Sequence, residues 1–247
     1  MVETMGFEPT TPALQTRCSS QLSYVPGIPV RHHCAIPAAN RHMIALPPYH
    51  RPMTDASPTV HTTPEFAAFS ALAVSRRTSL RIDPDRPVDP SLVAELCRMA
   101  TWAPNHHLTE PWRFAVVTGE NRAELGARAA AYQAEMGETV EARLHKTRGK
   151  YLRAPISLAV ACVVHPDPVT HAEDRDAVAA GIQNILLGAA ALGLASYWGS
   201  GLVTQAPQVK ALCGFGPDDA LIGIIYLGWP TSHMASPGRS EPQIRWM

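Results

Sequence analysis

The sequence has no excess of either charge, which argues against several classes of partner. Lysine plus arginine and aspartate plus glutamate number 21 each, so no overall basic field would attract nucleic acid or anionic lipid. Aromatic residues make up only 6%, which leaves few rings for stacking on bases. We therefore expect neither a nucleic-acid nor a membrane partner. The hydrophobic share of 46% is that of a globular protein with a core.

The cysteines show no pattern of pairing. There are five, an odd number, and none stands in a CxxC spacing. This usage fits reduced thiols in the cytoplasm and favours neither a disulfide framework nor a zinc site. We therefore expect a cytoplasmic protein without a bound metal. Cys97 and Cys162 lie in apolar runs and are expected in the core.

Motifs of side-chain catalysis are missing as well. The chain has no GxSxG, no HExxH, no P-loop and no GxGxxG that opens a helix after a strand. We find no convincing set of a nucleophile and its base. Such a chain is typical of an enzyme whose cofactor carries the chemistry, so we expect no catalytic side chain.

Residues 1–64 lack the periodicity of a folded segment, and prolines recur throughout them. The stretch GFEPTTPALQTRCSSQLSYVP resembles the peptide obtained when a transfer-RNA gene is translated, which would place the natural start at Met43 or Met53. A transit peptide is the alternative, but Glu3 and Glu8 weaken it. We expect a disordered or spurious leader over residues 1–64 and a folded domain over residues 65–247.

The rest of the chain is organised around residues 174–201. Acidic residues from Glu173 onward suit a helix N-terminus, and residues 177–194 are apolar apart from Gln183 and Asn184. A helix that is apolar on nearly every face is a core helix or a membrane span. The Gln-Asn pair and the lack of a basic flank favour the core helix. Gly193 is expected to end it, before a short strand at residues 196–198.

The remaining elements follow from hydrophobic period and from turn residues. Small residues in the central helix predict close packing against another helix: Ala179, Ala180, Gly188 and Ala189. We expect further helices at residues 65–75, 90–103, 120–136, 138–148 and 205–213, strands at 112–119, 156–164 and 221–229, and an extended tail at 231–247.

Two polar segments are candidate binding sites. The basic segment RRTSLR, residues 76–81, places guanidinium groups beside hydroxyls, a combination that binds phosphate. Its alternative is a solvated helix end whose cations face the helix dipole. The segment PNHHLTEP, residues 104–111, holds two histidines and an asparagine between prolines. It predicts a rigid polar loop, with an exposed turn as the alternative.

Four motifs occur in a fixed order: RRTSLR, APNHHLTEPWRF, QNILLGAAALGLASYWGSG and IGIIYLGWP. Together they resemble the FMN-dependent nitroreductase family, in particular its short single-FMN members, over residues 75–239. The resemblance implies an α+β fold with a central mixed β-sheet, flanked by helices around a buried central helix. It also implies an intertwined homodimer with FMN at the subunit interface.

The resemblance also implies roles for individual residues. Thr78 stands where serine is commoner, and Trp102 where some relatives carry a basic residue. The implied cofactor-binding residues are Arg76, Arg77 and Thr78 for the FMN phosphate and ribityl chain, His106 with Trp102 and Asn105 for the flavin of the other subunit, Trp198, Gly199 and Ser200 for the isoalloxazine ring, and Arg239 for the phosphate.

Members of the family take hydride from NADH or NADPH onto the flavin. They pass the electrons to nitroaromatics, quinones or similar acceptors in a ping-pong reaction, and we expect the same here. One alternative is a flavoenzyme of the same fold with another chemistry: a dehalogenase, an enoyl reductase or a flavin-fragmenting enzyme. A non-catalytic flavin-binding protein is the other.

Overall fold

The computed structural model describes residues 62–235 and 238–247, all of which belong to one compact unit, Pro58–Met247. The leader expected at residues 1–64 therefore lies almost entirely outside the described residues. Its assignment and the start at Met43 or Met53 stay predictions.

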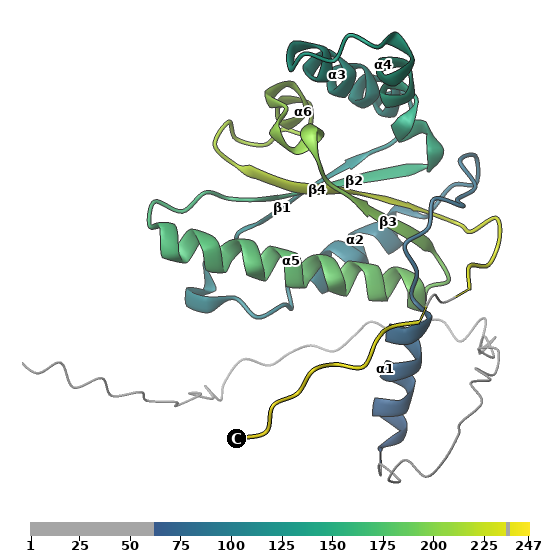
Figure 1. Ribbon diagram of the computed structural model, residues 1–247, viewed down its shortest axis with the longest axis vertical. Helices are drawn as coiled ribbons and strands as arrows, with labels where there is room; N and C mark the ends of the chain where they lie inside the picture. Colours follow the sequence, from purple (N-terminus) through teal and green to yellow (C-terminus); the bar gives the residue numbers. More distant parts are fainter. Residues whose placement is uncertain (1–61, 236–237) are drawn as a thin grey trace, which may run out of the picture. The chain divides into compact units, whose positions relative to one another are not determined.

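The core of the fold is a four-stranded sheet in the order β1-β2-β4-β3 (Figure 1). All three strand pairs are antiparallel. In the described residues the parallel component of the expected mixed sheet is an isolated bridge between Thr78 and Ser196. The α+β class is confirmed. The strands are β1 (Trp112–Val117), β2 (Ile156–Cys162), β3 (Ala195–Gly199) and β4 (Ala220–Gly228).

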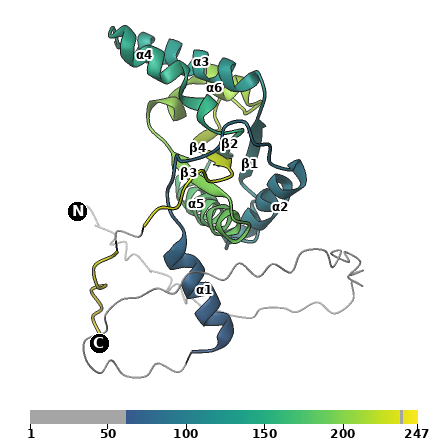
Figure 2. The ribbon, with the colours of Figure 1, turned by 90° about the vertical axis from the view of Figure 1, so that its right-hand side faces the viewer.

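Helices cover both faces of the sheet, so the described unit has three layers (Figures 1 and 2). One face carries α2 (Pro90–Ala100) and α5 (Pro168–Ala191), and the other carries α3 (Asn121–Glu135), α4 (Glu141–Arg148) and α6 (Pro207–Leu212). The remaining elements are α1 (Pro64–Ser75) and the 3₁₀ turns η1 (His106–Leu108), η2 (Lys150–Arg153) and η3 (Leu202–Gln205).

The two sheet faces hold two separate cores, which explains the unbroken apolar run of β2. Every residue of β2 is buried. Leu158 and Val160 pack in the core under α2 and α5, whereas Ala159 packs in the core under α3 and α6. A strand covered on both faces is apolar at every position, as the sequence predicts for residues 156–164.

The central helix α5 starts at Pro168, so the expected start near Asp174 is wrong. Asp167 caps it: its carboxylate accepts a hydrogen bond from the backbone nitrogen of Thr170 at 2.8 Å, and proline suits the first helical position. The expected end is confirmed, because Gly193 adopts a left-handed φ of 76° just beyond the last turn.

The close packing predicted for the central helix is against α2. A Cβ atom on Gly181 would lie 2.8 Å from the carbonyl oxygen of Ala100, and one on Gly188 would lie 2.7 Å from Cδ2 of Leu96. On another side of α5, Ala180 and Gln183 are exposed in the described part of the chain. Within the described residues no helix is both long and apolar enough to cross a bilayer.

The tail after β4 is extended, as expected. Its described residues after the bend at 231–232 form neither helix nor strand. Its start is fixed to the segment that follows α1: Ile82 forms an antiparallel bridge with Pro230, and Thr231 donates from its backbone nitrogen to the carbonyl of Arg81 at 3.0 Å.

Candidate functional site

Three arginines from distant parts of the chain form a cationic cluster, defined here as Arg76, Arg77 and Arg239. The pKa of Arg76 is lowered first by partial burial, then by the charge of Arg77 and then by that of Arg239. No ion pair with a carboxylate joins any of the three among the described residues. Cations that crowd together without counter-charge make a site for an anion.

One guanidinium of this cluster has an unused donor. Arg77 donates from its Nη1 atom to the carbonyl of Arg76 at 2.8 Å, yet its Nε atom is buried without a hydrogen-bond partner among the described residues. A buried donor without an acceptor is costly, and a bound anion would satisfy it. The residues therefore fit a phosphate group.

The cluster lies beside the start of β3. Thr78 forms the bridge with Ser196, and Ser79 donates from its backbone nitrogen to the carbonyl of Ser196 at 2.9 Å. Beyond Ser196, the outer edge of β3 has no partner strand in the described part of the chain. Its backbone groups there can serve a ligand.

A cavity of about 630 Å³ opens at the other end of β3. Trp198 and Ser200 line it from the strand end, and Arg175 and Asp176 line it from α5. The Trp198 indole lies over Gly223: a Cβ atom there would be 2.3 Å from the indole Nε1 atom. Glycine at position 223 is thus required for this position of the indole.

The second polar feature is residues 104–111, which we call the His106 loop. Three non-glycine residues in it have left-handed backbones: His107 (φ 63°), Leu108 (φ 52°) and Glu110 (φ 50°). Non-glycine residues adopt this region at a cost, and clusters of them mark functional or strained segments.

The side chain of Asn105 closes the His106 loop. Its Oδ1 atom accepts from the backbone nitrogen of Glu110 at 2.9 Å, and its Nδ2 atom donates to Oγ1 of Thr109 at 3.0 Å. Loop and helix are joined by Asp174 of α5, which accepts hydrogen bonds from the Thr109 hydroxyl and from Nδ2 of Asn105. Much of the Asn105 amide is therefore used within the loop.

His106 itself is exposed and pairs with α5. Its Nδ1 atom lies 2.8 Å from Oε2 of Glu173, and its ring stacks on that of His107 at 3.8 Å between centroids. Candidate metal-ligand atoms of these three residues all lie within 4.8 Å of one another. All three groups are at least partly open to solvent, which suits contact with another molecule.

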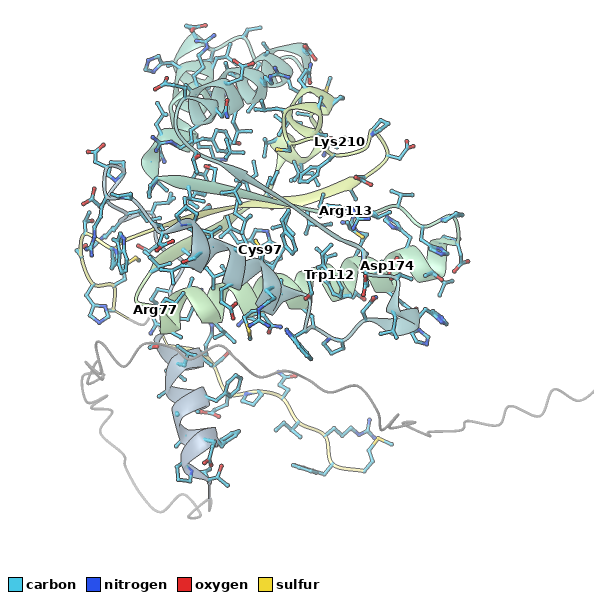
Figure 3. The ribbon with its side chains drawn as sticks, turned by 180° about the vertical axis from the view of Figure 1, so that it is seen from behind. Arg77, Cys97, Trp112, Arg113, Asp174 and Lys210 are labelled. Atoms are coloured by element: carbon cyan, nitrogen blue, oxygen red, sulfur yellow. The ribbon has the colours of Figure 1, made fainter. Side chains whose placement is uncertain are left out.

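The structure places the expected site residues in two regions, one along the cationic cluster and β3 and the other in the His106 loop. Figure 3 shows Arg77 near one end of α5 and Asp174 near the other. Thr78 and Ser200 are exposed, Trp198 is 38% exposed and Trp102 is 73% exposed. The first region holds Arg76, Arg77, Thr78 and Arg239, with Trp198, Gly199 and Ser200 following along β3; the second holds Trp102, Asn105 and His106.

Sequence reasoning missed two groups. Arg175 and Asp176 line the cavity, and Asp174 anchors the His106 loop. A signal for Asp174 was present in its spacing: it is in helical phase with Ala177, Val178 and Gly181, all buried. An aspartate on the buried face of a helix requires partners, and this marks it as a residue with a specific role.

The comparisons with known proteins agree with this geometry. The model of the nitroreductase family matches residues 73–229. The chain belongs to this family. The match runs from the last turn of α1 to the end of β4, so it includes the His106 loop and β3.

The matches to relatives of this nitroreductase-family chain cover most of each relative's length. YdjA of Escherichia coli strain K12 is 28% identical over 160 residues, 64% of this chain and 86% of YdjA. YfhC of Bacillus subtilis strain 168 is 30% identical over 161 residues, 64% of this chain and 82% of YfhC. Both carry the name NAD(P)H nitroreductase.

A solved structure shares the fold of this nitroreductase-family chain. The nitroreductase of Bacteroides fragilis, determined with bound FMN, matches with a TM-score of 0.60 and 20% identity. The match covers 75% of this chain and 100% of that one. At this identity the likeness establishes the nitroreductase fold.

Proposed function

We propose that this chain is an FMN-dependent NAD(P)H oxidoreductase that reduces nitroaromatic, quinone or similar acceptors. The observation that carries the proposal is the cationic cluster. In the described part of the chain, three guanidinium groups that form no ion pair lie where an unpaired strand edge begins, and that edge leads to a cavity. A ligand with a phosphate, then a polar chain and then a flat ring would place these parts at the cluster, the strand edge and the cavity, respectively.

The phosphate end would be held by the cluster. Arg77 offers a buried Nε donor that no described residue accepts from, and Arg76 and Arg239 add charge. Guanidinium groups bind phosphate through paired, charge-assisted hydrogen bonds. The hydroxyl of Thr78 lies next in the chain and is exposed, so it can contact the ribityl chain.

The ring end would lie by the cavity. At about 3.3 Å per residue, β3 extends about 13 Å from Ser196 to Ser200. Trp198, Gly199 and Ser200 would then border the isoalloxazine ring, with Trp198 and Ser200 facing it from the cavity wall. Bound FMN would accept hydride from NADH or NADPH and pass the electrons on to the acceptor.

We further propose that the active form is a homodimer with FMN at the subunit interface. The single chain leaves large apolar side chains in contact with solvent: α1 buries none of its residues, with Phe66 and Phe69 each 56% exposed, and Leu108 of the His106 loop is 82% exposed. Exposed apolar surface of this kind marks an interface. In such a dimer His106, Asn105 and Trp102 would serve the flavin of the partner.

The remaining assignments rest on the relatives and on the thiols. The names of YdjA and YfhC support NADH or NADPH as the electron donor. Cys97, Cys162 and Cys213 are free thiols, which supports a reducing compartment such as the cytoplasm.

An absorbance spectrum of the purified protein tests the proposal. We expect flavin bands that bleach when NADH or NADPH is added without oxygen and that return when a nitroaromatic or quinone follows. A protein that stays colourless after reconstitution with FMN would overturn the proposal. Flavin bands that do not bleach with either nucleotide would point to a non-catalytic flavin-binding protein, and bleaching without reoxidation by these acceptors to another flavin chemistry.

A further inference from the structure

We propose that Asp174 is a positioning residue: acting through Thr109 and Asn105, it holds the His106 loop in the shape that FMN binding requires. The inference rests on the proposed function and adds a residue that contacts neither the cationic cluster nor the cavity. Figure 3 shows Asp174 on α5 beside Trp112 and Arg113, which flank the C-terminal end of the loop.

The burial of Asp174 demands an explanation. It is 2% exposed and is the only buried carboxylate in the described residues. No lysine or arginine forms an ion pair with it there. A buried carboxylate is stable only where hydrogen bonds replace its hydration, and the side-chain donors that reach it, Thr109 and Asn105, belong to the His106 loop.

The loop needs such an anchor because its backbone is strained. The left-handed conformations of His107, Leu108 and Glu110 would relax in an isolated peptide, and they persist only where surrounding contacts fix them. Asn105 bonds across the loop to Glu110 and Thr109, which fixes its shape. Asp174 accepts hydrogen bonds from both Asn105 and Thr109, which fixes the loop against α5.

Two consecutive residues of α5 thus hold the two sides of the loop. Asp174 holds its buried side, and Glu173 holds the exposed ring of His106. The next two residues, Arg175 and Asp176, line the cavity. One helical turn therefore positions both the loop and one wall of the cavity. Release of the loop should lower the affinity for FMN without unfolding the domain.

The test compares two substitutions of Thr109 in the full chain. Thr109→Val keeps the shape but removes the hydroxyl that bonds to Asp174, whereas Thr109→Ser keeps the hydroxyl. Thr170→Val is the matched control, because the Thr170 hydroxyl bonds at 2.7 Å to Asp167 on the same helix in an exposed place. FMN dissociation constants are measured by fluorescence titration of the cofactor-free proteins, together with their melting temperatures.

We expect Thr109→Val to bind FMN about tenfold more weakly, as the loss of a hydrogen bond to a charged group would predict. Thr109→Ser and the control should bind within about twofold of the wild type. The flavin midpoint potential should shift in Thr109→Val and not in the control. Equal FMN affinity and an equal potential in Thr109→Val and Thr109→Ser would overturn the inference.

Hydrogen exchange separates a failure of this inference from a failure of the proposed function. The backbone amides of Leu108 and Glu110 donate to the carbonyl oxygen of Asn105 at 3.4 Å and to its Oδ1 atom at 2.9 Å. Their exchange is measured in the cofactor-free proteins. These amides should exchange faster in Thr109→Val and in Asp174→Asn than in the wild type. Unchanged exchange would overturn the anchoring role even if the wild type binds FMN. A wild type that does not bind FMN would instead refute the proposed function.

Discussion

Arg239, near the end of the chain, lies close enough to Arg76, at the end of α1, for its charge to lower the pKa of the Arg76 guanidinium. The extended tail brings them together, since its first residues are bonded to Arg81 and bridged to Ile82. Two cations repel each other, and a bound anion between them would offset this repulsion. The relationship therefore supports Arg239 as a phosphate residue of the proposed site.

Replacing Arg76 by alanine should yield cofactor-free protein. Hydrogen bonds to charged groups contribute about 1.5–3 kcal/mol, so FMN affinity should fall about 10- to 100-fold. Arg239→Ala should act in the same direction. The flavin content of the purified proteins gives the measurement, and Arg143→Ala, which breaks only the exposed pair with Glu138, is the control. A fully yellow Arg76→Ala protein would count against the assignment.

Removing all residues after Pro230 should leave a monomer or an aggregate. The described residues of the tail form no helix or strand, and Trp246 is 88% exposed, so the apolar groups of the tail need a partner surface. Light scattering gives the oligomeric state. A chain that ends at Pro242 keeps Arg239 and separates the effect of the tail's end from that of the phosphate site. An unchanged dimer in the shorter chain would refute the role of the tail.

Gly181→Ala should destabilise the fold more than Gly188→Ala. The added carbon on Gly181 would meet the backbone of Ala100, which cannot move alone, whereas the one on Gly188 meets the flexible end of Leu96. Overpacking costs about 1–3 kcal/mol. The higher helix propensity of alanine offsets about 0.5–1 kcal/mol in both variants. Urea unfolding compares the two, and equal midpoints would contradict the packing of α5 on α2.

Stability should fall as the pH rises above about 9. Burial raises the pKa of Cys97, Cys162 and Cys213 from the ordinary value of 9.0 to about 11 each. Between these values the unfolded chain loses thiol protons that the folded chain retains, so alkali favours unfolding. The melting temperature should therefore drop between pH 8.5 and pH 11. Cys213→Ala should make the drop shallower, and a melting temperature that does not change with pH would contradict the burial of these thiols.

The sequence predicted the elements whose burial is uniform. β2 is buried on both faces, so its apolar run indicates a strand without ambiguity, and Gly193 ends α5 because a left-handed residue is needed there. The predicted start of α5 is wrong because acidic residues suit the first turn of a helix, whereas Glu173, Asp174 and Asp176 lie further along α5. The observed start is marked in the sequence by Asp167, which can cap a helix, and by the proline after it.

The site was harder to predict because its geometry depends on contacts between distant segments. The basic segment and the His106 loop stand out by composition alone. No local pattern indicates that Arg239 approaches Arg76, or that the Asn105 amide bonds within its own loop. The anchoring by Asp174 joins residues of two elements, and only the three-dimensional fold brings them into contact.

The open edge of β3 also bears on solubility. A strand edge with free backbone groups is a template on which another chain can add a strand, and proteins that leave such edges bare tend to aggregate. Here the edge beyond Ser196 has no partner strand within the described chain. Whatever binds along it therefore also shields it, so the protein stripped of that molecule should be lost to precipitation before it is lost to unfolding.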